Sequence, residues 1–96
     1  MSRLRLTPRA RADLDAIWNY TAERWSIEQA ETYLHALGIT MSLLAKLPDI
    51  GRNIDAISPG YLKFPAASHV IFYRKTGGAI EVVRILHKSL DVEAHL

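Results

Sequence analysis

The spacing of apolar residues changes from one segment of the chain to the next. This spacing separates the segments predicted as strands from those predicted as helices. Two runs rich in Val, Ile, Phe and Tyr, residues 69–76 and 79–87, flank Gly77-Gly78. β-Branched and aromatic runs around a glycine pair predict a β-hairpin. A two-residue turn at Gly77-Gly78 places Arg74 opposite Glu81 near the tip of the hairpin. Shifting the strand pairing by one residue would separate these opposite charges. The predicted pairs are Thr76 with Ala79, Arg74 with Glu81, Phe72 with Val83, and Val70 with Ile85.

This register gives the hairpin two faces of different character. One face is apolar, and we expect helices to cover it because a sheet buries such a face against another layer. It holds Val70, Phe72, Val83 and Ile85. The other face adds His, Tyr and Arg, which is typical of a surface that meets a ligand or partner, with a half-solvated face as the alternative. It holds His69, Ile71, Tyr73, Ile80, Val82, Arg84 and Leu86.

Residues 3–47 predict a short strand followed by two helices. The alternation in Arg3–Leu6 indicates a strand, and Thr7-Pro8 then matches an N-cap with proline in the first helical position. We expect this helix to end near Arg24 and a second one to run from Ser26 to Leu47. The second helix has a wide apolar stripe, which suggests contact with both its partner helix and the sheet, or with an external partner. The stripe comprises Ile27, Ala30, Leu34, Leu37, Met41 and Leu44.

The rest of the chain predicts one long connection and a third strand ahead of the hairpin. Residues 48–60 are bounded by Pro and Gly, and we expect an irregular packed segment anchored by Ile50, Ile54 and Ile57. A strand over residues 61–64 should end at Pro65, and residues 88–96 form a tail with one helical turn. The predicted order is β-α-α-β-β-β, an α+β fold in one domain over residues 1–96: an N-terminal strand and a helical hairpin packed on an antiparallel sheet.

Composition narrows the functional classes. The 96 residues include no cysteine, which excludes disulfides, thiol catalysis and cysteine-based zinc sites. There is no signal peptide and no apolar run of membrane length, so we expect a soluble cytoplasmic protein without membrane contact. The net charge of +2 is modest and only Arg3, Arg5, Arg9 and Arg11 cluster, so nucleic-acid binding has little support.

Several groups of residues could in principle form a metal, catalytic or phosphate-binding site, but their predicted positions argue against it. His87, Asp91 and His95 are spaced four apart, but His87 closes a predicted strand, so no metal site is expected. Asp13 and Asp15 point to different sides of a helix, where they complement the helix dipole. No glycine-rich phosphate loop is present, and we predict no cofactor.

The remaining candidate centres on Arg84 in an apolar strand. An arginine there needs a carboxylate, a phosphate or water. A ribonuclease would use arginine for the scissile phosphate and His or Tyr for proton transfer. Alternatively, Arg84 binds an acidic segment of a partner protein or forms an ion pair within the chain. These two alternatives together are favoured over catalysis. The surrounding candidates are His69, Tyr73, Arg52, His87 and Lys88.

The chain resembles the ParE branch of the ParE/RelE toxin superfamily, over nearly its whole length and with similar spacing. The motifs are Leu6-Thr7-Pro8, Ala12-Asp13-Leu14, Ile17-Trp18-Asn19-Tyr20, Leu47-Pro48 with Gly51-Arg52, Phe64, His69-Val70-Ile71-Phe72-Tyr73-Arg74, and Ile80 to His87 with Asp91. Leu90 stands where Met is common, a conservative departure. Lys88 and Ser89 stand where the ribonuclease branch often has Tyr.

The resemblance implies a toxin of a type II toxin-antitoxin system that inhibits DNA gyrase and replication. Its partner would be a ParD-like antitoxin, which is a ribbon-helix-helix protein. The toxin would contact DNA only indirectly, through this antitoxin. Formation of a toxin homodimer is left open. No catalytic residue is expected. The predicted antitoxin-binding residues are Trp18, Ile27, Leu34, Leu37, Met41, Ile71, Tyr73, Val82 and Arg84. The alternatives are a ribosome-dependent mRNA endoribonuclease using Arg84, His87 and Tyr73, and a degenerate toxin that only binds its antitoxin.

Overall fold

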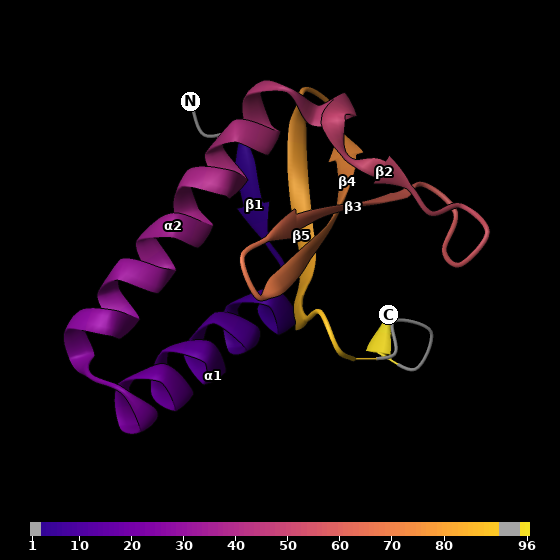
Figure 1. The fold of residues 1–96 in the computed structure, drawn as a ribbon. Helices are drawn as coiled ribbons and strands as arrows, with labels where there is room; N and C mark the ends of the chain where they lie inside the picture. Colours follow the sequence, from indigo (N-terminus) through magenta and orange to yellow (C-terminus); the bar gives the residue numbers. More distant parts are fainter. Residues whose placement is uncertain (1–2, 91–94) are drawn as a thin grey trace.

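A computed structural model describes residues 3–90 and 95–96 and shows two helices packed on a five-stranded sheet (Figure 1). The predicted β-α-α-β-β-β order is confirmed, with a short 3-10 helix, η1, and a short strand, β2, added between the helices and the last three strands. The elements are β1 (Leu4–Leu6), α1 (Pro8–Arg24), α2 (Ile27–Lys46), η1 (Pro48–Ile50), β2 (Arg52–Asn53), β3 (Tyr61–Ala66), β4 (His69–Thr76) and β5 (Ala79–His87).

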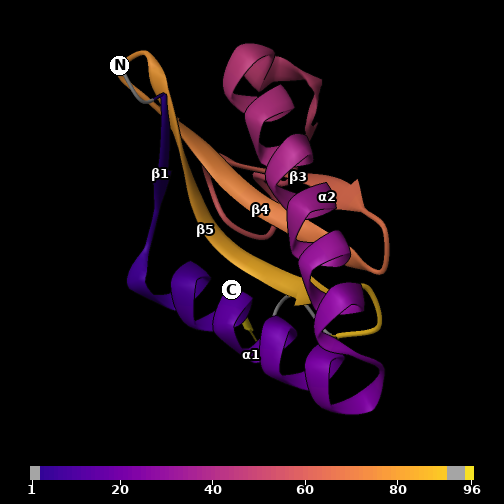
Figure 2. The same ribbon diagram turned by 90° about the vertical axis from the view of Figure 1, so that its left-hand side faces the viewer.

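Both helices begin where the sequence predicts. The Thr7 hydroxyl accepts a hydrogen bond from the Ala10 N–H, and the Ser26 hydroxyl accepts one from the Gln29 N–H. Each therefore satisfies one of the N–H groups left without a partner at a helix start. The Thr7 hydroxyl also donates to the Val83 carbonyl, which fixes the start of α1 against β5. Figure 2 shows α2 lying in front of the sheet and α1 running beneath the end of β5.

The sheet has the order β1-β5-β4-β3-β2, with β1 parallel to β5 and the other pairs antiparallel. The turn at Gly77-Gly78 is confirmed, and both glycines have positive φ, at 45° and 83°. The register near the tip is also confirmed, since Arg74 pairs with Glu81. Their side chains approach to 2.7 Å.

A β-bulge interrupts the hairpin in its middle, and the predicted register is wrong beyond it. Tyr73 pairs with Val82 but Phe72 pairs with Arg84, which leaves Val83 as the extra residue on β5. Val70 consequently pairs with Leu86 and not with Ile85. The sequence of β5 does not alternate strictly, and its adjacent apolar pairs Val82-Val83 and Ile85-Leu86 do not show which residue is the extra one.

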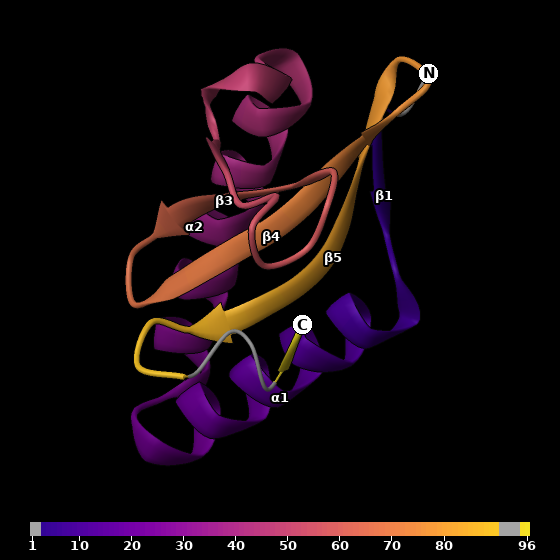
Figure 3. The ribbon, with the colours of Figure 1, turned by 90° about the vertical axis from the view of Figure 1, so that its right-hand side faces the viewer.

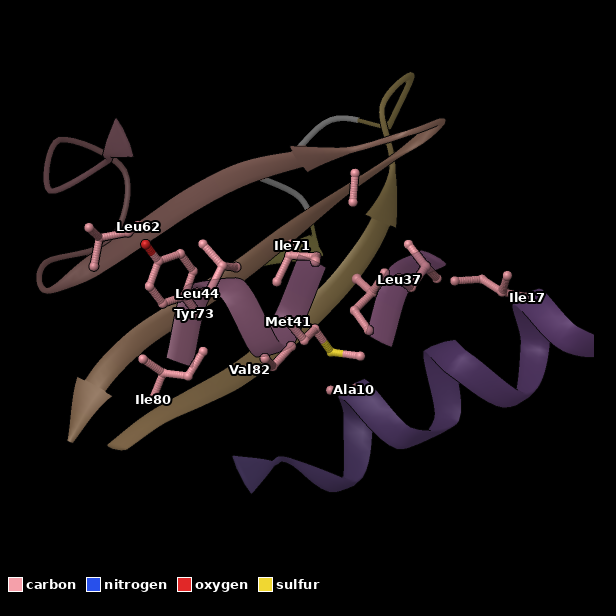
Figure 4. Packing of buried hydrophobic residues seen from close by; sticks show 12 residues of the cluster. Ala10, Ile17, Leu37, Met41, Leu44, Leu62, Ile71, Tyr73, Ile80 and Val82 are labelled. Atoms are coloured by element: carbon pink, nitrogen blue, oxygen red, sulfur yellow. The ribbon is translucent and has the colours of Figure 1, made fainter. Parts of the chain in front are cut away.

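The predicted assignment of the two faces is wrong for most residues. The face under the helices carries Ile71, Tyr73, Ile80, Val82 and Ile85, together with Ala10, Ile17, Leu37, Met41 and Leu44 from the helices (Figure 4). The opposite face carries a smaller cluster of Ile54, Phe72 and Leu86, with Val70, Tyr61 and Leu96 packed against it. The prediction placed the purely apolar face of the hairpin under the helices, but apolar side chains cover both faces of the sheet. Ile85 and Leu86, which follow the bulge, lie on their predicted sides, because the extra residue exchanges the faces of the positions after it.

The connection between α2 and β3 covers the outer face of the sheet, as Figure 3 shows. Ile54 is a buried anchor as predicted, but Ile50 and Ile57 are 41% and 40% exposed, so their predicted anchoring is wrong. Pro65 does not end β3, because β2 pairs only with Leu62 and Lys63, and the strand beyond them is an edge that tolerates proline.

The sequence also predicts a helical turn in the C-terminal tail and no membrane-spanning segment. Part of the tail predicted to make a helical turn, residues 91–94, lies outside the described residues. Within the part of the chain that the structure describes, no helix is long and apolar enough to cross a membrane.

Candidate functional site

A groove of about 680 Å³ opens between α1, the start of α2 and the ends of β4 and β5. Its lining includes Arg84 and Asp13 together with aromatic and imidazole side chains. Tyr20 and Trp25 at its rim are 63% and 70% exposed. The lining residues are Asp13, Ala16, Ile17, Tyr20, Thr21, Trp25, Gln29, Tyr33, Ser68, His69, Arg84, Ile85, Leu86, His87, Leu90 and His95.

The Arg84 guanidinium is held by Asp13 of α1 in a bidentate pair. Its Nε donates to Asp13 Oδ2 at 2.7 Å and its Nη2 donates to Asp13 Oδ1 at 2.9 Å. Asp13 Oδ2 also accepts the Ile85 N–H, and Arg84 Nη1 donates to the His95 carbonyl. The two side chains are only 13% and 14% exposed, and the hydrogen bond to Asp13 raises the pKa of Arg84. The internal pairing considered for Arg84 is therefore confirmed.

Tyr73 is fully buried and tied to the segment after α2. Its hydroxyl donates to the Pro48 carbonyl at 2.7 Å and accepts the Gly51 N–H at 3.0 Å. Burial raises the pKa of Tyr73. Tyr73 is not among the groove residues, so the predicted grouping of Arg84 with Tyr73 around one site is wrong.

A second polar group joins three elements at the groove wall. Tyr33 of α2 lies 2.7 Å from His69 Nδ1, and its oxygen accepts the Ser68 N–H. The ring of His69 packs edge-on against that of His87, with centroids 5.4 Å apart. Burial and the neighbouring His87 lower the pKa of His69, and Asp13 offsets this in part. The group holds the start of α2 against the ends of β4 and β5.

The predicted antitoxin-binding residues divide into two sets. Ile27 is 58% exposed, and Trp18 and Leu34 are partly buried on the helices. Five others lie in the core and are not exposed to a partner: Leu37 and Met41 on the sheet-facing side of α2, and Ile71, Tyr73 and Val82 on the face of the sheet that the helices cover. Arg84 reaches the groove, but Asp13 already neutralises its charge.

Sequence reasoning missed two residues of the site, Asp13 and Tyr33. Asp13 was assigned to the helix dipole, although an arginine in an apolar strand requires an anion and Asp13 lies on the helix that crosses this strand. The two residues are 71 positions apart in the sequence, so no local signal indicates this pairing. Tyr33 was not among the predicted site residues, although its hydroxyl lies 2.7 Å from His69 Nδ1. Across residues 3–90 and 95–96, no group of three or more His, Asp or Glu side chains could hold a metal ion.

Comparison with known proteins now identifies the family. The family model described as "ParE toxin of type II toxin-antitoxin system, parDE" matches residues 4–92. The chain belongs to the ParE toxin family. It is 49% identical to "Toxin ParE1" of Mycobacterium tuberculosis strain H37Rv, over 99% of this chain and 98% of that protein. It is 42% identical to "Toxin ParE1" of Caulobacter vibrioides strain CB 15, over 100% and 99% of the two chains.

A solved structure supports the fold of this ParE family member. The structure titled "Chromosomal ParDE TA system from P. aeruginosa" matches with a TM-score of 0.78, and covers 91% of this chain and 96% of the other. The two sequences are 24% identical, so this likeness concerns the fold. The resemblance inferred from the sequence motifs is confirmed at the level of the family.

Proposed function

We propose that the chain is a non-enzymatic toxin that inhibits DNA gyrase and is held inactive by a ParD-like antitoxin. Membership of the ParE family supports this proposal. The observation that carries it is the internal use of Arg84 and Tyr73. A nuclease needs a cation that can meet a phosphate and a group that can move a proton. Arg84 is already paired with Asp13, and the Tyr73 hydroxyl is enclosed between Pro48 and Gly51.

We further propose that the antitoxin contacts the exposed apolar side chains where α1 meets α2. Trp25, Tyr20 and Ile27 are all more than half exposed, and Trp25 and Tyr20 also line the groove. Large aromatic and aliphatic groups beside a groove are typical anchors for a partner segment. Trp18 and Leu34 lie on the same two helices and would form the inner part of the contact.

The gyrase proposal is tested with purified components. Supercoiling of relaxed plasmid by gyrase should fall when the chain is added and recover when its antitoxin is present. Ribosome-bound mRNA should stay whole under the same conditions. Fragmented mRNA with unchanged supercoiling would establish the ribonuclease alternative. Neither activity, with antitoxin binding retained, would indicate a degenerate toxin.

Matched variants separate the two mechanisms further. A nuclease that uses His87 or Tyr73 for proton transfer should lose about 10²- to 10⁴-fold in rate in His87→Ala or Tyr73→Phe. A binding protein should lose toxicity only as far as the variants lose stability. Gly51→Ala is the control for Tyr73→Phe, because it disturbs the same contact and keeps the hydroxyl. The proposal requires these two variants to have equal toxicity at equal stability.

The antitoxin contact is tested by hydrogen exchange and by substitution. Antitoxin binding should slow exchange of amides at the start of α2, and Ile27→Asp should weaken binding at least tenfold. Ile57→Asp makes the same change at an exposed isoleucine in the connection before β3, and should bind as the wild type does. Equal loss of affinity in both variants would contradict the proposed surface.

A further inference from the structure

Two histidines face each other at the end of the hairpin beside the groove. His69 opens β4, His87 ends β5, and the two are paired across the strands. Their ring centroids are 5.4 Å apart and their planes lie at 83°. We propose that His69 and His87 form a two-histidine site for a late transition-metal ion of the Zn²⁺, Ni²⁺ or Cu²⁺ class. This site goes beyond the proposed toxin function and does not depend on it.

The separation of the rings fits one shared ion. Zinc lies about 2.0–2.1 Å from an imidazole nitrogen, so two imidazoles on one tetrahedral ion have centroids roughly 5 Å apart. The observed separation of 5.4 Å agrees with this value. Both side chains line the groove, so an ion has a path from solvent.

The hydrogen bonds of the two rings leave the same nitrogen available on each. His69 Nδ1 lies 2.7 Å from the Tyr33 hydroxyl oxygen, and His87 Nδ1 lies 2.7 Å from Ser89 Oγ. Neither Nε2 has a partner among the described residues. Metal binding at Nε2 places the ring proton on Nδ1, where Tyr33 and Ser89 accept it. His87 Nδ1 then gives up the 3.2 Å bond that it accepts from the Ser89 N–H.

These outer contacts resemble those that orient histidine ligands in metal sites. A metal ion binds the imidazole in its neutral form, so its binding competes with protonation of the two rings. Asp13, the carboxylate that acts on His69, is held by Arg84 and supplies no third ligand. Two imidazoles with water in the remaining positions favour Zn²⁺, Ni²⁺ or Cu²⁺ over Mg²⁺ or Ca²⁺.

Calorimetric titration of the untagged full chain with Ni²⁺ at pH 7.5 tests the site. We expect one ion per chain, and at least a tenfold loss of affinity in both His69→Ala and His87→Ala. His35→Ala is the matched control, since His35 is exposed on α2, and it should bind as the wild type does. Affinity should also fall from pH 7.5 to pH 6, because protons compete for the imidazoles. Equal binding of Mg²⁺, or unchanged Ni²⁺ affinity in the His69→Ala/His87→Ala double variant, would overturn the proposal.

Nuclear magnetic resonance of the wild-type protein provides a test that does not depend on the folding of any variant. Substoichiometric Ni²⁺ should broaden the ring proton signals of His69 and His87 first, and both to a similar extent. Earlier broadening of His35 or His95 would place the ion elsewhere and would refute the assignment. His95 is the more stringent comparison, because it also lines the groove.

Discussion

The contact between Gly51 and Tyr73 predicts a large effect from the addition of a single methyl group. A Cβ at position 51 would lie 2.2 Å from the Tyr73 hydroxyl oxygen and 2.8 Å from two carbons of its ring. Tyr73 cannot move aside, because it is fully buried and its hydroxyl is bonded to Pro48 and Gly51. Overpacking costs about 1–3 kcal/mol and a lost hydrogen bond about 1 kcal/mol more. We expect Gly51→Ala to lower the free energy of unfolding by about 2–4 kcal/mol.

Urea unfolding followed by tryptophan fluorescence measures this effect. With a denaturant slope of about 1–2 kcal/mol/M, the midpoint should fall by at least about 1 M. Gly38→Ala is the matched control, because a Cβ there meets nothing within 4 Å and the residue lies within α2. It should raise stability by about 0.5–1 kcal/mol through helix propensity. Midpoints that shift in the same direction in both variants would refute the argument from close approach. Combining Gly51→Ala with Tyr73→Phe should cost less than the sum of the two, because the closest clash disappears.

Two further predictions concern the groove. Asp13→Asn should cost about 3–5 kcal/mol, because it breaks a nearly buried bidentate pair, whereas Glu81→Gln in the exposed pair with Arg74 should leave the urea midpoint almost unchanged. The lowered pKa of His69 means that the unfolded chain binds more protons below about pH 6.5. Stability should therefore fall as the pH drops from 7.5 to 5.5, and His69→Gln should fall less over this range; an equal fall would contradict this role, with His35→Gln as control.

The elements of the fold that depend on local signals were predictable from the sequence. Thr7-Pro8 and Ser26 define both helix starts, and Gly77-Gly78 defines the turn. Each signal arises within a few residues of the structure that it determines. The family resemblance extended these predictions to the whole chain, and its motifs are mainly residues that pack or cap.

The features that were missed depend on contacts between distant residues. The bulge near Tyr73 brings Ile85 to the helix side, and the adjacent apolar residues Val82 and Val83 do not show which of them is the extra residue. The two-residue strand β2 forms only because Leu62 and Lys63 offer it an edge. The error in the two faces of the hairpin has a different source, because apolar side chains cover both faces of the sheet and hydrophobicity alone did not show which face lies under the helices. Most of the predicted binding residues on the sheet were lost in this way.

The same long-range contacts change what Arg84 indicates about function. A phosphate would have to displace Asp13 from both guanidinium nitrogens and also leave the Ile85 N–H without its acceptor. Breaking a buried pair costs about 3–5 kcal/mol, which corresponds to roughly a hundredfold to several thousandfold in affinity. A partner that binds the exposed Trp25 and Ile27 incurs no such cost, because both side chains are already in solvent. The arginine that suggested a catalytic role in the sequence therefore joins α1 to the sheet through Asp13, which agrees with our proposal that a partner is recognised by exposed apolar side chains such as Trp25 and Ile27.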